Sequence, residues 1–140
     1  MSPGKAAAVV NQTIHLTRVV LADNNAVVRA NLHQLLDNAG NIIVVAEASD
    51  GQEACTLAGQ QKPDVLVLDM NLTAMSGIEV TRWVRSHYSS MGVLILTTHE
   101  DEPQAQAVLR AGANGVVLKT ASPETIIQAV RAAYKNKSRS

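Results

Sequence analysis

The chain has 140 residues, enough for one domain with a single hydrophobic core and too few for two well-packed domains. Hydrophobic residues make up 46% of it and charged residues 17%, a composition that excludes intrinsic disorder. Twelve basic and twelve acidic side chains cancel to a net charge of +0, so no overall field attracts nucleic acid or an anionic membrane. Because no apolar run approaches the roughly 18 residues of a membrane span, we predict a soluble, cytoplasmic protein that binds neither partner directly.

Five short apolar runs recur along the chain, and a polar or charged residue stands where each run stops. The runs and these residues are Val19–Ala22 with Asp23, Ile42–Val45 with Glu47, Val65–Leu68 with Asp69, Val93–Leu96 with Thr97, and Val116–Leu118 with Lys119. Runs of this length, rich in Val and Ile, are typical of strands in a parallel sheet that is covered on both faces.

Helical periodicity fills the segments between these runs. The expected helices carry apolar stripes at 28–39, 54–58, 76–88, 103–109 and 122–133, with glycines at 40 and 112 as stop signals. In the fourth helix, Ala105, Val108 and Leu109 are expected to face the core. Cys55, the only cysteine, is expected to be a buried structural thiol, and Arg85 a solvated helix residue.

Strand alternating with helix five times predicts a doubly wound α/β fold, and five strands in about 120 residues favour the flavodoxin-like order 2-1-3-4-5. The first and third strands are then central neighbours, so Asp23 and Asp69 face each other at the carboxyl edge of the sheet, where ligands bind. Thr97 and Lys119 share this edge, whereas Glu47 lies at the margin of the sheet. We assign the domain to residues 17–134, with an N-terminal tail at 1–16 and a C-terminal tail or linker start at 135–140.

The four side chains at this edge suit phosphate and metal chemistry. An aspartate can act as a nucleophile toward phosphorus and form an aspartyl phosphate. Transfer then depends on positioning and on neutralising the charge of the phosphoryl group, which Mg²⁺ and a lysine can provide. Asp69 fits the nucleophile, Asp23 the metal side, Lys119 the cation, and Thr97 a hydroxyl donor to a phosphoryl oxygen.

The order and spacing of these motifs resemble the receiver domain of a two-component response regulator, most of all the receivers that precede a helix-turn-helix DNA-binding domain. The similarity covers roughly residues 17–134 and rests on segments 69–77, 96–97 and 111–115 together with Asp23 and Lys119. Each segment alone is a weak signal, but all of them occur in order at the expected strand ends.

The resemblance implies a role for each residue at the edge. Asp69 would accept a phosphoryl group from a sensor histidine kinase, while Asp23, Asp69 and the main-chain carbonyl of Asn71 would hold Mg²⁺. Lys119 would pair with the phosphoryl group, and Thr97 would move toward it. The signal would pass to a DNA-binding output domain outside this chain, or to a homodimer formed through the fourth helix, fifth strand and fifth helix.

The chain departs from the family pattern beside these residues. Asn24 stands at the acid that usually contacts the metal, so we expect Asn24 to be a weaker ligand and the affinity for Mg²⁺ to be reduced. Val116 stands where the ring of a Tyr or Phe usually reports the state of the threonine. Together with Thr98 and His99, which follow that threonine, Val116 is expected to modulate the site.

Three functions remain open from the sequence. The main hypothesis is a phosphorylatable switch that is no enzyme beyond its own phosphorylation and dephosphorylation. The departures from the pattern also allow a pseudo-receiver that acts by protein contact without phosphate. A small hydrolase or phosphotransferase comes third, because the sequence shows no glycine-rich nucleotide loop and no second general acid or base near Asp69. His15, His33 and His87 have no ligand spacing with one another and are assigned no role, and the chain is expected to be either a free-standing receiver or part of a longer protein.

Overall fold

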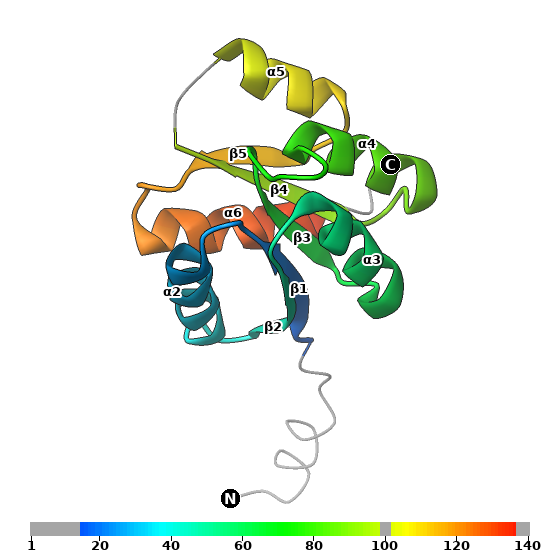
Figure 1. The fold of residues 1–140 in the computed structure, drawn as a ribbon. Helices are drawn as coiled ribbons and strands as arrows, with labels where there is room; N and C mark the ends of the chain where they lie inside the picture. Colours follow the sequence, from blue (N-terminus) through cyan, green and yellow to red (C-terminus); the bar gives the residue numbers. More distant parts are fainter. Residues whose placement is uncertain (1–14, 99–101, 137–140) are drawn as a thin grey trace, which may run out of the picture.

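Strands and helices alternate along the chain. The computed structural model describes residues 15–98 and 102–136. Its strands are β1 (Thr17–Ala22), β2 (Ile42–Ala48), β3 (Val65–Asp69), β4 (Gly92–Thr97) and β5 (Gly115–Leu118). Its helices are α2 (Ala26–Asp37), α3 (Gly51–Gln61), α4 (Gly77–His87), α5 (Glu102–Arg110) and α6 (Pro123–Asn136). The predicted alternation is therefore confirmed (Figure 1).

The strands form one parallel sheet in the order β2-β1-β3-β4-β5, as predicted. Helices α2 and α6 cover one face of the sheet, and α3, α4 and α5 cover the other (Figure 1). Because side chains alternate along a strand, each strand contributes to both cores. In β1, Val19 and Leu21 pack on the side of α2 and α6, whereas Val20 and Ala22 pack on the side of α3 and α4. Every residue of β3 and β4 is buried, as expected for strands covered on both faces.

A one-residue bulge interrupts the pairing of β2 with β1. Val44 and Ala46 pair with consecutive residues of β1, which leaves Val45 as an extra residue in β2. Since successive side chains of a strand point to opposite faces, one extra residue reverses the alternation of the strand beyond it. Glu47, which pairs with Leu21, consequently lies on the face that α2 covers.

Side-chain caps define where three of the helices begin. The Asn25 side chain accepts hydrogen bonds from two main-chain N–H groups in the first turn of α2, and Asp50 accepts one at the start of α3. At α4, Ser76 and Glu79 form a reciprocal capping box. These caps fix the loops that follow β1, β2 and β3, and hence the side chains at the strand ends.

Two predicted side-chain environments are wrong. Leu109 is 45% exposed, because consecutive helix residues point about 100° apart and the fully buried Val108 already fills the strip along which α5 packs. Arg85 is half-buried and bound to main-chain groups, where a solvated side chain was predicted. Its guanidinium donates to the main-chain oxygens of Gly112 (2.9 Å) and Met91 (2.7 Å), and burial lowers its pKa. Arg85 therefore joins α4 to the loops before β4 and β5.

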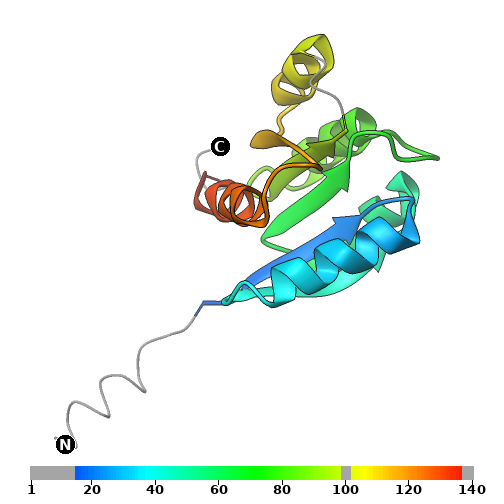
Figure 2. The ribbon, with the colours of Figure 1, turned by 90° about the vertical axis from the view of Figure 1, so that its left-hand side faces the viewer.

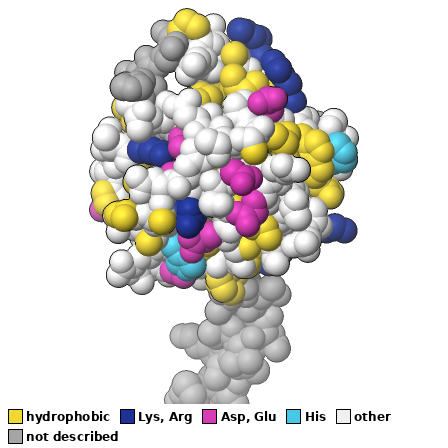
Figure 3. Space-filling view, viewed as in Figure 1, with side chains coloured by type: hydrophobic (Ala, Val, Ile, Leu, Met, Phe, Trp, Pro, Cys, Tyr) yellow, Lys and Arg dark blue, Asp and Glu magenta, His cyan; other side chains and the backbone are white. Residues whose placement is uncertain are grey.

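No helix within the described residues is long and apolar enough to cross a membrane. On the face shown in Figure 3, basic side chains lie at separate positions and several acidic side chains lie near the centre.

Candidate functional site

The carboxyl ends of the strands bring the four predicted side chains to one edge of the sheet. Asp69 is the last residue of β3 and Thr97 the last of β4, while Asp23 and Lys119 directly follow β1 and β5. The arrowheads of β1 and β3 point to the same end of the molecule in Figure 2. Asp23, Asp69 and Thr97 are all buried, which is unusual for polar residues and indicates specific partners.

Lys119 holds the two carboxylates together. Its ammonium lies 2.6 Å from Asp23 Oδ2 and 3.2 Å from Asp69 Oδ2. The main-chain N–H of Lys119 donates to the carbonyl of Thr97 (2.8 Å), so the lysine is anchored to the end of β4. Asp23 Oδ2 is buried and accepts no hydrogen bond from the described residues, so its partner is the electrostatic contact with the ammonium.

The second oxygen of each carboxylate accepts a main-chain hydrogen bond from the loop that follows. Asp23 Oδ1 accepts from the N–H of Asn25 (2.8 Å), and Asp69 Oδ1 accepts from the N–H of Asn71 (3.3 Å). These turns hold both carboxylates in place at the edge.

Asn24, in the loop after β1, contacts two residues of the loop after β3. Its Nδ2 donates to the main-chain oxygen of Asn71 (2.8 Å), the carbonyl predicted to hold Mg²⁺. Its Oδ1 accepts from the N–H (3.2 Å) and the hydroxyl (3.4 Å) of Thr73. The amide oxygen that could take a metal is thus engaged by Thr73.

The oxygen atoms at this edge fit a hard divalent cation. Mg²⁺ prefers oxygen ligands and typically takes one or two carboxylates while it keeps several waters. Asp23 and Asp69 provide carboxylates from adjacent strands, and Asn71 provides a main-chain carbonyl. The residues that the structure describes contain no group of three or more His, Cys, Asp or Glu side chains arranged for a metal.

The predicted modulating residues differ in their surroundings. Val116 is half-buried in β5 and packs against the core on the side of α3 and α4, and Thr98 is exposed just beyond β4. His99 lies outside the described residues.

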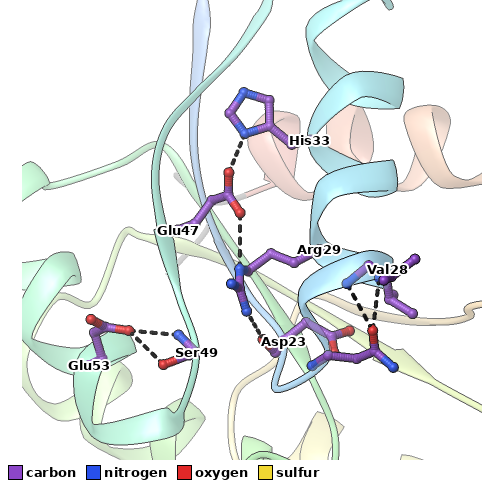
Figure 4. Close-up of polar contacts among 9 residues, drawn as sticks. Asp23, Val28, Arg29, His33, Glu47, Ser49 and Glu53 are labelled. Atoms are coloured by element: carbon purple, nitrogen blue, oxygen red, sulfur yellow. Dashed lines mark hydrogen bonds and ion pairs between the residues drawn. The ribbon is translucent and has the colours of Figure 1, made fainter.

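An ion-pair cluster beside the site was missed from the sequence. His33 on α2 contacts Glu47 on β2 (2.5 Å) through Nδ1 and Asp37 (2.8 Å) through Nε2. Glu47 also accepts from Arg29 Nε (3.0 Å), and the Arg29 guanidinium donates to the main-chain oxygen of Asp23 (2.7 Å; Figure 4). The hydrogen bond with Glu47 is the main cause that raises the pKa of His33. The spacing of His33 and Asp37, four residues apart on one helix, was the only sequence signal for this cluster.

A five-stranded sheet of this order, with two carboxylates and a lysine at its carboxyl edge, defines a receiver domain. The family model for the response regulator receiver domain matches residues 19–131. The chain belongs to this family, and its function is that of a receiver domain of two-component response regulators, as the motifs predicted.

Two curated relatives illustrate the similarity. The chain is 39% identical to the oxygen regulatory protein NreC of Staphylococcus haemolyticus over 119 residues, which are 84% of this chain and 55% of NreC. It is 37% identical to the transcriptional regulatory protein LiaR of Bacillus subtilis over 120 residues, 86% of this chain and 57% of LiaR. The chain thus spans little more than half the length of these relatives.

Solved structures show the same architecture. A two-component response regulator of the LuxR family from an Aurantimonas species superposes with a TM-score of 0.83 at 34% identity, over 86% of each chain. The response regulator domain of CheB from Thermotoga maritima superposes with a TM-score of 0.80 at 25% identity, over 86% of this chain and 98% of that one.

Proposed function

We propose that this receiver domain takes up a phosphoryl group on Asp69 from a phosphohistidine of a sensor histidine kinase. The P–N bond of the phosphohistidine breaks, a bond forms between phosphorus and an Asp69 carboxylate oxygen, and the imidazole leaves with the electron pair. The observation that carries this proposal is the position of Lys119, whose ammonium lies 3.2 Å from Asp69 Oδ2 and 2.6 Å from Asp23 Oδ2.

The other residues of the edge have supporting roles in this proposal. Asp23, Asp69 and the carbonyl of Asn71 hold Mg²⁺, which neutralises charge on the phosphoryl oxygens. Lys119 is placed to pair with the phosphoryl group once Asp69 carries it. Thr97 ends β4, and its carbonyl accepts from the N–H of Lys119, so a shift of either residue affects the other. The domain catalyses no reaction beyond the uptake and loss of this group.

We further propose that this protein is cytoplasmic, that a sensor histidine kinase supplies the phosphoryl group and that a DNA-binding domain outside this chain receives the signal. The names of the relatives, a transcriptional regulator among them, support this proposal. A homodimer would use the face formed by α5, β5 and α6. Within α5, Leu109 is an exposed apolar side chain, and exposed apolar groups favour protein contacts.

Intact mass spectrometry tests the phosphorylation. The protein is incubated with Mg²⁺ and a small acyl phosphate, and we expect a single phosphoryl adduct that Asp69→Asn abolishes. Asp64→Asn is the matched control. Asp64 directly precedes β3, at the end of the strand opposite to Asp69, so this variant should keep the adduct. A folded parent protein that forms no adduct over a wide range of Mg²⁺ concentrations would instead indicate a receiver that acts without phosphate.

A further inference from the structure

The orientation of the Asn24 carboxamide is determined by its partners. The N–H of Thr73 can only donate and the carbonyl of Asn71 can only accept. Exchanging the oxygen and nitrogen of the Asn24 amide would therefore place oxygen against oxygen at Asn71 and N–H against N–H at Thr73. The amide nitrogen consequently faces the Asn71 carbonyl.

Both ends of this contact are held in place. On one side, Asp23 accepts from the N–H of Asn25, and Asn25 caps α2, which fixes the main chain around Asn24. On the other side, the carbonyl of Thr73 accepts from the N–H of Gly51 (3.0 Å) at the start of α3. The Asn24 side chain thus ties the loop after β1 to the loop after β3.

An aspartate at position 24 could not make the same pair of contacts. Its carboxylate could accept from Thr73, but an oxygen at the distance of 2.8 Å from the Asn71 carbonyl would need a proton or a cation between the two. The asparagine meets this carbonyl with a hydrogen bond instead. The positive end of that N–H dipole points to the oxygen proposed as a metal ligand and repels a cation there.

We propose that Asn24 is a positioning residue that competes with a divalent cation for the Asn71 carbonyl. The two hydrogen-bonded contacts of Asn24, to Asn71 and to Thr73, are here called the amide latch. Closed, the latch holds the two loops together without a cation; a cation that binds the carbonyl displaces the amide nitrogen. The competition with a cation rests on the metal site of the proposed function. The amide latch itself does not depend on that site.

Two variants of the full chain separate this proposal from a simple loss of charge. Asn24→Asp removes the N–H donor and adds a carboxylate, so Mg²⁺ should bind at least about tenfold more tightly by calorimetry. Asn24→Ala removes the latch and adds no ligand, and it should still tighten Mg²⁺ binding several-fold, by about the value of one hydrogen bond. Asn31→Asp, which adds an acid at an exposed position of α2, is the matched control and should leave Mg²⁺ affinity near that of the parent.

Hydrogen exchange of the Thr73 amide tests the latch without cation or phosphodonor. In Asn24→Ala this amide should exchange about tenfold faster than in the parent, because its acceptor is gone. Unchanged Thr73 exchange would overturn the latch. Asn24→Ala that binds Mg²⁺ no more tightly than the parent would overturn the competition. If neither Asn24→Asp nor the parent bound Mg²⁺ at all, the proposed metal site and the competition would both fall, while the Thr73 exchange would still decide on the latch.

Discussion

Removing the ammonium of Lys119 should leave two carboxylates buried without compensation. Coulomb attraction over 2.6 Å and 3.2 Å is about 6 and about 5 kcal/mol at an effective dielectric constant of about 20. The side chains of Lys119, Asp23 and Asp69 are only 15%, 2% and 10% exposed, so water screens them little, but desolvation on folding offsets much of the attraction. We expect Lys119→Met to lower the free energy of unfolding by about 3–5 kcal/mol, the usual cost of breaking a buried pair.

Urea unfolding measures this loss and identifies its cause. Lys135→Met, an exposed change in the last turn of α6, should cost less than about 0.5 kcal/mol. Adding Asp23→Asn to Lys119→Met removes one of the two uncompensated buried charges. The free energy of unfolding should then rise again by at least about 1 kcal/mol. A loss below about 1 kcal/mol for Lys119→Met, or no recovery in the double variant, would refute the view that the lysine compensates these carboxylates.

Three further predictions concern packing, pH and thiol reactivity. Gly51→Ala should destabilise the protein by about 1–3 kcal/mol in urea unfolding, because a Cβ would lie 1.9 Å from the Met75 carbonyl oxygen. The pKa of His33 is raised above its ordinary value of 6.5, chiefly by the hydrogen bond with Glu47. The stability gained from protonated His33 is therefore complete below that value and is lost as the pH rises through the raised one, so His33→Gln should destabilise at about pH 6 and have little effect at about pH 9. Burial raises the pKa of the Cys55 thiol to about 11, so a disulfide reagent at neutral pH should label Cys55 quickly only after unfolding.

Each of these three predictions would be contradicted by a specific result. Gly51→Ala with parental stability would mean that the loop before α4 can move away from α3 at little cost. An equal effect of His33→Gln at both pH values would show that the imidazole acts by packing and not by charge. Fast labelling of folded Cys55 would show that the core beside α3 opens readily.

The shared position of the residues at the strand ends could be predicted, because it depends on the topology of the sheet more than on individual side-chain contacts. Val65–Leu68 predicts a buried strand, and a doubly wound sheet places the residue after each such strand at the shared carboxyl edge. The sequence therefore predicts that Asp23, Asp69 and Lys119 lie together. The orientation of the Asn24 amide could not be predicted, since it depends on which main-chain groups of another loop face it.

The environments of Arg85, Leu109 and His33 could not be predicted, because they depend on how elements pack against one another in the fold. Arg85 has the helical position of a solvated residue, and only the fold brings the carbonyl of Gly112 to it. Leu109 has the spacing of a core residue, but α5 packs along a narrower strip than that spacing implies. His33 meets Glu47 because of the bulge in β2, which leaves no mark in a run of Ile and Val.

Because of the bulge at Val45, the side of the sheet on which Glu47 lies depends on how β2 pairs with β1 and not on residue type. Regular pairing of all seven residues of β2, without the bulge, would turn Glu47 toward α3, although every residue of the ion-pair cluster would remain. The Arg29 guanidinium, which donates to the main chain of Asp23, would then lose its acidic partner. A homologue with the same residues but an unbulged β2 would thus lack this support for the loop that carries the first carboxylate.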